Sequence, residues 1–183
     1  MRPLPVIFRL LALGGIACSD SNGLPNATIE NIERTDTLWA LVGTPVSTPS
    51  GYSVDGSRRV RTDLSVDFDF AYNETAGEQV FLPRAALGID TANAAKPGFQ
   101  LRNESFEAIT LAPSNGYITD LAVSIAVGQR YVVRSRITCQ IGVPKYAKLE
   151  ILSFDAATRI VSFRILTNDN CGFKSLEPGL PDR

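Results

Sequence analysis

The residues of this chain that could take part in chemistry are few in kind. None of its 183 residues is histidine, which excludes Ser-His-Asp and Cys-His catalytic arrangements. Asp67 and Asp69 would lie about 6.5–7 Å apart on one strand, a separation compatible with carboxylate-pair hydrolysis or a calcium site. The commoner alternative is two acids on the solvent side of a sheet. Since phosphate-binding loop motifs are also missing from the sequence, we expect a non-enzymatic protein.

A second group of residues could bind anions. Basic residues and one tyrosine recur at alternate positions in the C-terminal third of the chain: Arg134, Arg136, Lys148, Arg164 and Tyr146. On one face of a sheet they would form a candidate patch for carboxylates or phosphates. The alternative is an ordinary solvated face whose charges discourage edge pairing. The net charge of −1 provides no overall field that would attract nucleic acid, so no nucleic-acid partner is expected.

Two of the three cysteines, Cys139 and Cys171, are candidates for a disulfide. Closing a loop of this length would stabilise the fold by about 3–4 kcal/mol on the chain-entropy model. The alternative is a two-cysteine metal site, but no histidine is available to complete it. We therefore expect a Cys139–Cys171 disulfide and no metal.

The N-terminus has the composition of a targeting segment. Arg2 and Arg9 supply positive charge, and residues 10–17 form an uncharged, mostly apolar run that ends in small residues. This run has roughly half the length that a transmembrane helix needs, and it fits the apolar region of a signal peptide. We expect residues 1–17 to be a signal peptide, which implies an oxidising compartment that permits the disulfide.

The third cysteine, Cys18, follows this leader directly. Gly15-Ile16-Ala17-Cys18 resembles the lipobox of bacterial lipoproteins, in which the cysteine is lipidated and becomes the mature N-terminus. The alternative is a plain secretory signal followed by a spare cysteine. Ser19 after the cysteine resembles lipoproteins that are forwarded to an outer membrane. The resemblance implies an exported protein attached to a membrane by its lipid anchor, on the outer membrane or cell surface or in the periplasm.

The remaining chain is expected to be a polar tether, residues 18–36, followed by a single all-β domain, residues 37–183. Strands are expected at 37–43, with Trp39 in the core, and at 52–60 with a break at Asp55-Gly56. Residues 80–82 predict a short strand, and 84–89 could form another. Period-two alternation predicts one further strand from apolar residues at every second place: Leu64, Val66, Phe68, Phe70 and Tyr72. Phe99, after Pro97-Gly98, is either a ligand-stacking aromatic or a core residue, and the sequence does not decide between these roles.

The C-terminal third predicts a three-stranded antiparallel meander. Its strands are expected at about Arg130–Cys139, Lys145–Phe154 and Arg159–Thr167, with a tight turn at 155–158. Strands on either side of a third are too far apart for direct bridging, so the loop that carries Cys171 must fold back over the end of the sheet. The fold class that follows is all-β, an antiparallel β-sandwich or barrel-like domain.

Several segments resemble a known family. The segments 129–135, 145–151 and 160–164 look like the C-terminal hairpin region of HmuY-type haem-binding lipoproteins. Residues 68–72 are similar to an aromatic-Asp-apolar-Ala motif of that family, and 106–120 resemble its central segment. Together these segments cover about a quarter of the chain beyond the leader. The resemblance implies an all-β fold, surface lipoprotein status and a role in haem capture.

The chain departs from this family in its haem ligands. Axial ligands to haem iron are His, Met, Cys or Tyr, but histidine is absent and the single methionine, Met1, belongs to the expected signal peptide. With two cysteines expected in a disulfide, only tyrosines remain: Tyr52, Tyr72, Tyr117, Tyr131 and Tyr146. We therefore expect a lipid-anchored binding or scaffold protein without a cofactor. The alternatives are a haem or porphyrin carrier that uses tyrosine ligation, and a structural or adhesive surface lipoprotein with no small-molecule ligand.

Overall fold

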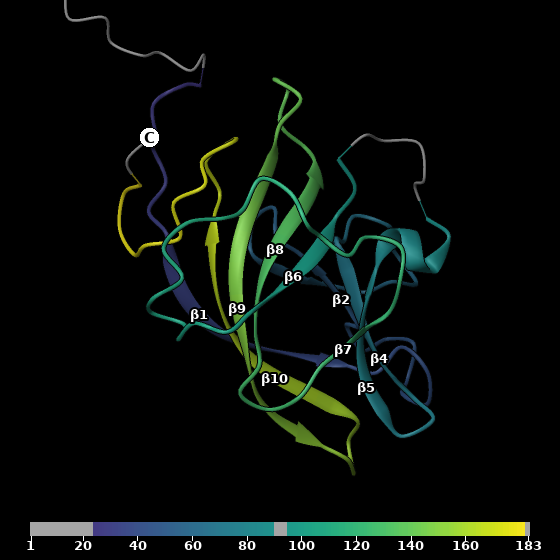
Figure 1. Cartoon of the computed structure of the whole chain (residues 1–183). Helices are drawn as coiled ribbons and strands as arrows, with labels where there is room; N and C mark the ends of the chain where they lie inside the picture. Colours follow the sequence, from purple (N-terminus) through teal and green to yellow (C-terminus); the bar gives the residue numbers. More distant parts are fainter. Residues whose placement is uncertain (1–23, 90–94, 182–183) are drawn as a thin grey trace, which may run out of the picture.

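The computed structural model describes residues 24–89 and 95–181, which form two antiparallel sheets (Figure 1). Cys18 and the expected signal peptide, residues 1–17, lie outside the described residues. Within the described ranges no helix is long and apolar enough to cross a membrane. The expected all-β class is confirmed.

The first sheet contains the C-terminal meander. Its strands, in spatial order, are β1 (Ile32–Trp39), β10 (Ile160–Asn168), β9 (Pro144–Asp155), β8 (Arg130–Ile137) and β6 (Gly98–Arg102). The meander β8–β9–β10 is confirmed with strand ends within two residues of those expected. At the β9–β10 turn, the Asp155 carboxylate accepts hydrogen bonds from the backbone N–H groups of Ala157 and Thr158, which fixes the reversal.

The second sheet is built from shorter strands. In spatial order they are β3 (Arg58–Val60), β2 (Gly51–Ser53), β4 (Phe70–Thr75), β5 (Glu78–Pro83) and β7 (Val123–Ser124). The strand expected at 52–60 is a β2–β3 hairpin that turns at the predicted break. Residues 84–87 form a 3₁₀ helix rather than a strand; it ends at Gly88, whose φ of 71° allows the left-handed cap.

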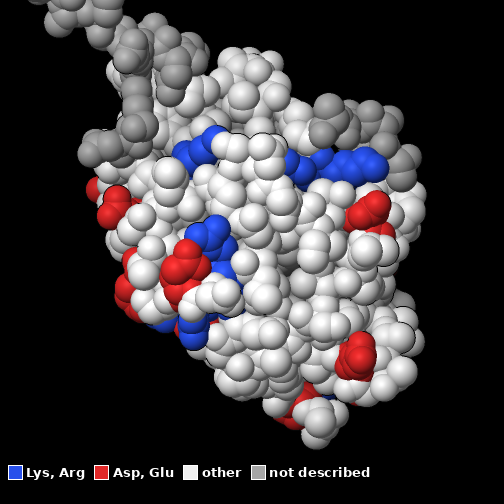
Figure 2. Space-filling model, in the orientation of Figure 1, with Lys and Arg blue, Asp and Glu red and all other residues white. Residues whose placement is uncertain are grey.

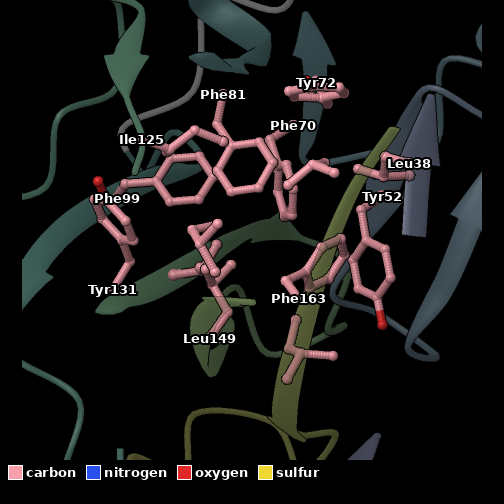
Figure 3. Packing of buried hydrophobic residues seen from close by; sticks show 14 of the residues in the cluster. Leu38, Tyr52, Phe70, Tyr72, Phe81, Phe99, Ile125, Tyr131, Leu149 and Phe163 are labelled. Carbon is pink, nitrogen blue, oxygen red and sulfur yellow. The ribbon is translucent and has the colours of Figure 1, made fainter. Parts of the chain in front are cut away.

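The core lies between the sheets and is rich in aromatic rings (Figure 3). Phe81 stacks on Phe99 with ring centroids 5.3 Å apart, and Phe70 packs edge-on against Phe99 at 4.9 Å. Phe99 is thus a core residue. Trp39 was expected in the core but is only half-buried, because alternation along the edge strand β1 turns Leu38 inward instead.

The strand expected at 64–72 is only partly correct. Strand β4 begins at Phe70, and the side chains of Leu64 and Val66 are 71% and 58% exposed. A turn replaces the first half of the expected strand, because the N–H groups of Leu64 and Ser65 both bond to the carbonyl of Arg61. The alternating apolar residues Leu64 and Val66 therefore lie in a segment that, in the described part of the chain, pairs with no neighbouring strand.

The expected boundary between the tether, residues 18–36, and the domain lies too late in the sequence. Strand β1 begins at Ile32, five residues before the expected start at Thr37. Before β1, the N–H groups of Thr28 and Ile29 both donate to Asn170 Oδ1, and Asn31 pairs with Gly179 through two backbone hydrogen bonds. The chain is therefore part of the domain soon after Leu24.

Candidate functional site

The expected disulfide is confirmed. Cys139 and Cys171 are bonded, with their Cα atoms 5.9 Å apart. Cys139 follows β8 and Cys171 follows β10, so the loop after β10 folds back over the end of the sheet as predicted. The N–H of Gly172 donates to the carbonyl of Pro144 at 3.1 Å, which holds this loop against the first residue of β9.

A small pocket lies beside the disulfide, where the start of the described chain meets the loop after β10. Its volume is about 280 Å³, and its walls are Pro25, Asn26, Thr28, Ile29, Asp169, Asn170, Cys171 and Phe173. Ligand sites for drug-sized molecules usually span about 300–1,000 Å³. The pocket is therefore at the small end for an organic ligand.

The predicted anion patch is not a single open surface. A β-bulge between Arg134 and Ile137 shifts the register of β8, so Arg136 faces the second sheet while Arg134 faces outward. Arg136 donates to Asp69 Oδ1 and to Ser53 Oγ at 3.1 Å. The bulge thus separates two residues that simple alternation places on one face.

Lys148 was expected on a solvated face but is buried, with 2% of its surface exposed. The segment 103–121 crosses the outer face of β8 and β9 (Figure 1) and packs Phe106 and Ile109 against it. Lys148 Nζ donates to the Ile109 carbonyl at 3.0 Å and lies 4.6 Å from the centre of the Phe106 ring. Burial lowers the pKa of Lys148, and the carboxylate of Glu107 opposes this shift.

The other outward-facing residues of the predicted patch also pack against the segment 103–121, which covers this face of the sheet. The Arg134 guanidinium lies 4.7 Å from the centre of the Tyr117 ring, and that of Arg164 lies 4.0 Å from the centre of the Phe106 ring. Arg164 also binds Glu150 at 2.6 Å, and Tyr146 is buried. Figure 2 shows the basic side chains of this face in separate groups. The arrangement fastens a covering layer to the sheet.

The two carboxylates of the predicted pair, Asp67 and Asp69, also lie in different surroundings. Asp67 is exposed, whereas Asp69 is completely buried between the sheets, against the expectation of two outward acids. Asp69 Oδ2 accepts the N–H of Val54 at 2.7 Å, and Oδ1 accepts the N–H of Arg136 at 2.6 Å and its guanidinium at 3.3 Å. Burial raises the pKa of Asp69, and the Arg136 guanidinium opposes that rise.

A second ion cluster joins the β2–β3 turn to the loop after β10. Lys145 Nζ binds Asp55 at 2.5 Å and Asp169 at 3.4 Å, and the N–H of Gly56 donates to Asp169 at 2.9 Å. Burial acts to raise the pKa of Asp55. The hydrogen bond and the positive charge of Lys145 act against burial, and the pKa is lowered from its usual value. Sequence reasoning missed this cluster, because its members come from distant segments and no local pattern links them.

Three of the five tyrosine hydroxyls, those of Tyr72, Tyr117 and Tyr131, donate hydrogen bonds within the fold. The hydroxyl of Tyr131 donates to the Ser124 carbonyl at 2.8 Å, that of Tyr117 to the Pro113 carbonyl at 2.8 Å, and that of Tyr72 to Gln79. Burial raises the pKa of both Tyr72 and Tyr131 to about 12. Tyr52 is buried in the core. In the described ranges, no three Cys, Asp or Glu side chains come together in a way that could hold a metal ion.

No protein-family model, no curated protein and no solved structure matches this chain.

Proposed function

We propose that this chain is an exported lipoprotein, cleaved after Ala17, lipidated on Cys18 and held at a membrane surface as a non-enzymatic binding or scaffold domain. The observation that carries the proposal is the Cys139–Cys171 disulfide. A disulfide is typical of proteins in oxidising compartments, which agrees with the signal-peptide pattern. It also accounts for two of the three cysteines, so Cys18 alone is left for lipid.

Scaffolding or binding fits the domain better than catalysis. The basic and acidic side chains of the candidate sites bind one another or pack on aromatic rings inside the fold, and each interaction joins two segments of the domain. Kinship with the HmuY family is part of the proposal. It rests on the sequence segments described above, and the all-β fold agrees with it.

Substituting Cys18→Ser tests the lipid anchor. In a bacterial host supplied with labelled palmitate, the unsubstituted chain should incorporate label and fractionate with membranes. The Cys18→Ser variant should lose both properties, because the thiol that accepts the diacylglyceryl group is gone. A Cys139→Ser/Cys171→Ser variant is the matched control and should still be labelled. Label in the Cys18→Ser variant, or none in the unsubstituted chain, would refute the proposal.

A haemin titration distinguishes the proposed function from the carrier alternative. We expect no saturable Soret shift, because iron-bound tyrosine is a phenolate and burial disfavours that form of Tyr72 and Tyr131. Ligation by Tyr131 or Tyr117 would also break a hydrogen bond to a backbone carbonyl. Saturable binding that one Tyr→Phe substitution abolishes would instead establish tyrosine-dependent haem capture.

A further inference from the structure

The loop between β8 and β9 forms an uncharged tip on the molecule. Residues 138–143 read Thr-Cys-Gln-Ile-Gly-Val, and Ile141 at their centre is 51% exposed. The N–H of Gly142 donates to the Cys139 carbonyl at 2.9 Å, and Gly142 has a φ of +73°, so the loop makes a defined turn. The tip projects beyond the two sheets (Figure 1), and the projection carries no charge in Figure 2.

The described chain begins at the base of this tip. A side-chain carbon added at Gly172 would lie 2.8 Å from Leu24 Cδ2 and 3.1 Å from Val143 Cγ2, so Leu24 and Val143 both pack on Gly172. Cys18 precedes Leu24 by only six residues. Six residues span at most about 22 Å even when fully extended. Acyl chains on Cys18 would therefore bring a lipid surface within about 22 Å of this end of the domain.

The charged residues that flank the tip in the sequence, Arg136 and Lys145, are already paired. Lys145, which follows the tip, binds Asp55 and Asp169, and its side chain is 13% exposed. Arg136, which precedes the tip, binds the buried Asp69. Contact between the tip and lipid would therefore bury an isoleucine without stripping water from these ions. The disulfide at Cys139 holds the loop in place, which lowers the entropy cost of docking.

We propose that this tip docks on the membrane that carries the lipid anchor, with Ile141 inserted among the lipid head groups and upper acyl chains. The inference rests on the proposed lipidation of Cys18. A lipid surface is the occupant that the chain itself would bring to this end, and an uncharged apolar tip suits it. The opposite end of the sandwich, with the β9–β10 turn and Trp39, would then face away from the membrane.

Fluorescence quenching by brominated lipids tests the docking. Two variants carry a single tryptophan in a Trp39→Phe background: Ile141→Trp at the tip, and Leu152→Trp as the matched control. Leu152 is an exposed aliphatic residue near the other end of β9, about 26 Å from Pro144 along the strand. The lipidated proteins are inserted into phosphatidylethanolamine–phosphatidylglycerol vesicles with bromines at shallow acyl positions. Mass spectrometry first confirms the acylation of each sample.

An interfacial side chain lies about 5–10 Å into the boundary of head groups and acyl chains, so Ile141→Trp should lose about half of its emission or more. Leu152→Trp should lose almost none. If the acylated Ile141→Trp protein is quenched no more than its control, or if both are strongly quenched, the docking is refuted while the lipid anchor stands. If the samples are not acylated, both proposals fail. Should Trp39→Phe prevent folding, the comparison is made with Trp39 retained and its constant emission subtracted.

Discussion

Substituting Asp69→Ala is expected to lower the free energy of unfolding by about 3–5 kcal/mol, the usual cost of removing one member of a buried ion pair. The Arg136 side chain is 12% exposed and would lose its closest carboxylate. The N–H groups of Val54 and Arg136 would also lose their acceptor within the sandwich. Urea unfolding followed by circular dichroism measures the change.

Asp67→Ala is the matched control for this substitution. Asp67 is two residues away, its side chain is 63% exposed, and its carboxylate is 4.0 Å from Arg136. A surface pair of this kind contributes about 0–1 kcal/mol. The two variants should therefore differ by at least about 2 kcal/mol. Equal losses would mean that the buried carboxylate does not hold the sheets together.

Replacing both Cys139 and Cys171 with serine is expected to cost about 3–4 kcal/mol, because the unfolded chain regains the entropy of an open loop. The sequence separation of 32 residues sets this magnitude. The effect should also be local. The loop after β10 carries Asn170, which holds the chain start through Thr28 and Ile29, so that segment should become accessible to protease first.

Reduction of the unsubstituted protein provides the comparison for the double variant. Reductant should lower its urea midpoint to that of the Cys139→Ser/Cys171→Ser protein, and it should leave the variant unchanged. If reductant has no effect on the unsubstituted protein while the thiols titrate as free, the bond contributes nothing to stability.

The meander could be predicted because its three strands show continuous alternation and are separated by clear turn residues. At 64–69 the same alternation occurs without a ladder partner, since backbone hydrogen bonds to Arg61 close a turn there. Period two reports which side chains could share a face. It does not report whether a neighbouring strand exists, and this explains the late start of β4 at Phe70.

The candidate site was predicted less well, for two physical reasons. Alternation correctly placed Lys148 opposite the main core, but burial also depends on a covering segment from elsewhere in the chain. The apolar residues Phe106, Ile109 and Ala112, outside any strand, were the available signal for such a cover. The inward turn of Arg136 depends on a β-bulge, which a regular alternation pattern cannot show.

The sequence alone misplaces the start of the domain, because the polar composition of residues 18–36 is typical of a tether. Glu33, Arg34 and Thr35 are exposed on β1, an edge strand that is hydrogen-bonded only to β10 within its sheet. An edge strand with a solvated outer half has the composition of a linker. Its pairing with β10 at the opposite end of the chain leaves no local signal in the sequence.

The most direct test of the proposed lipid anchor is the mass of the N-terminal peptide of the mature protein, isolated from a membrane fraction and analysed by mass spectrometry. The proposed lipid anchor predicts a peptide that begins at Cys18 and carries a diacylglyceryl group on its sulfur. A native protein that begins at Met1, or one that has an unmodified thiol at Cys18, would contradict it.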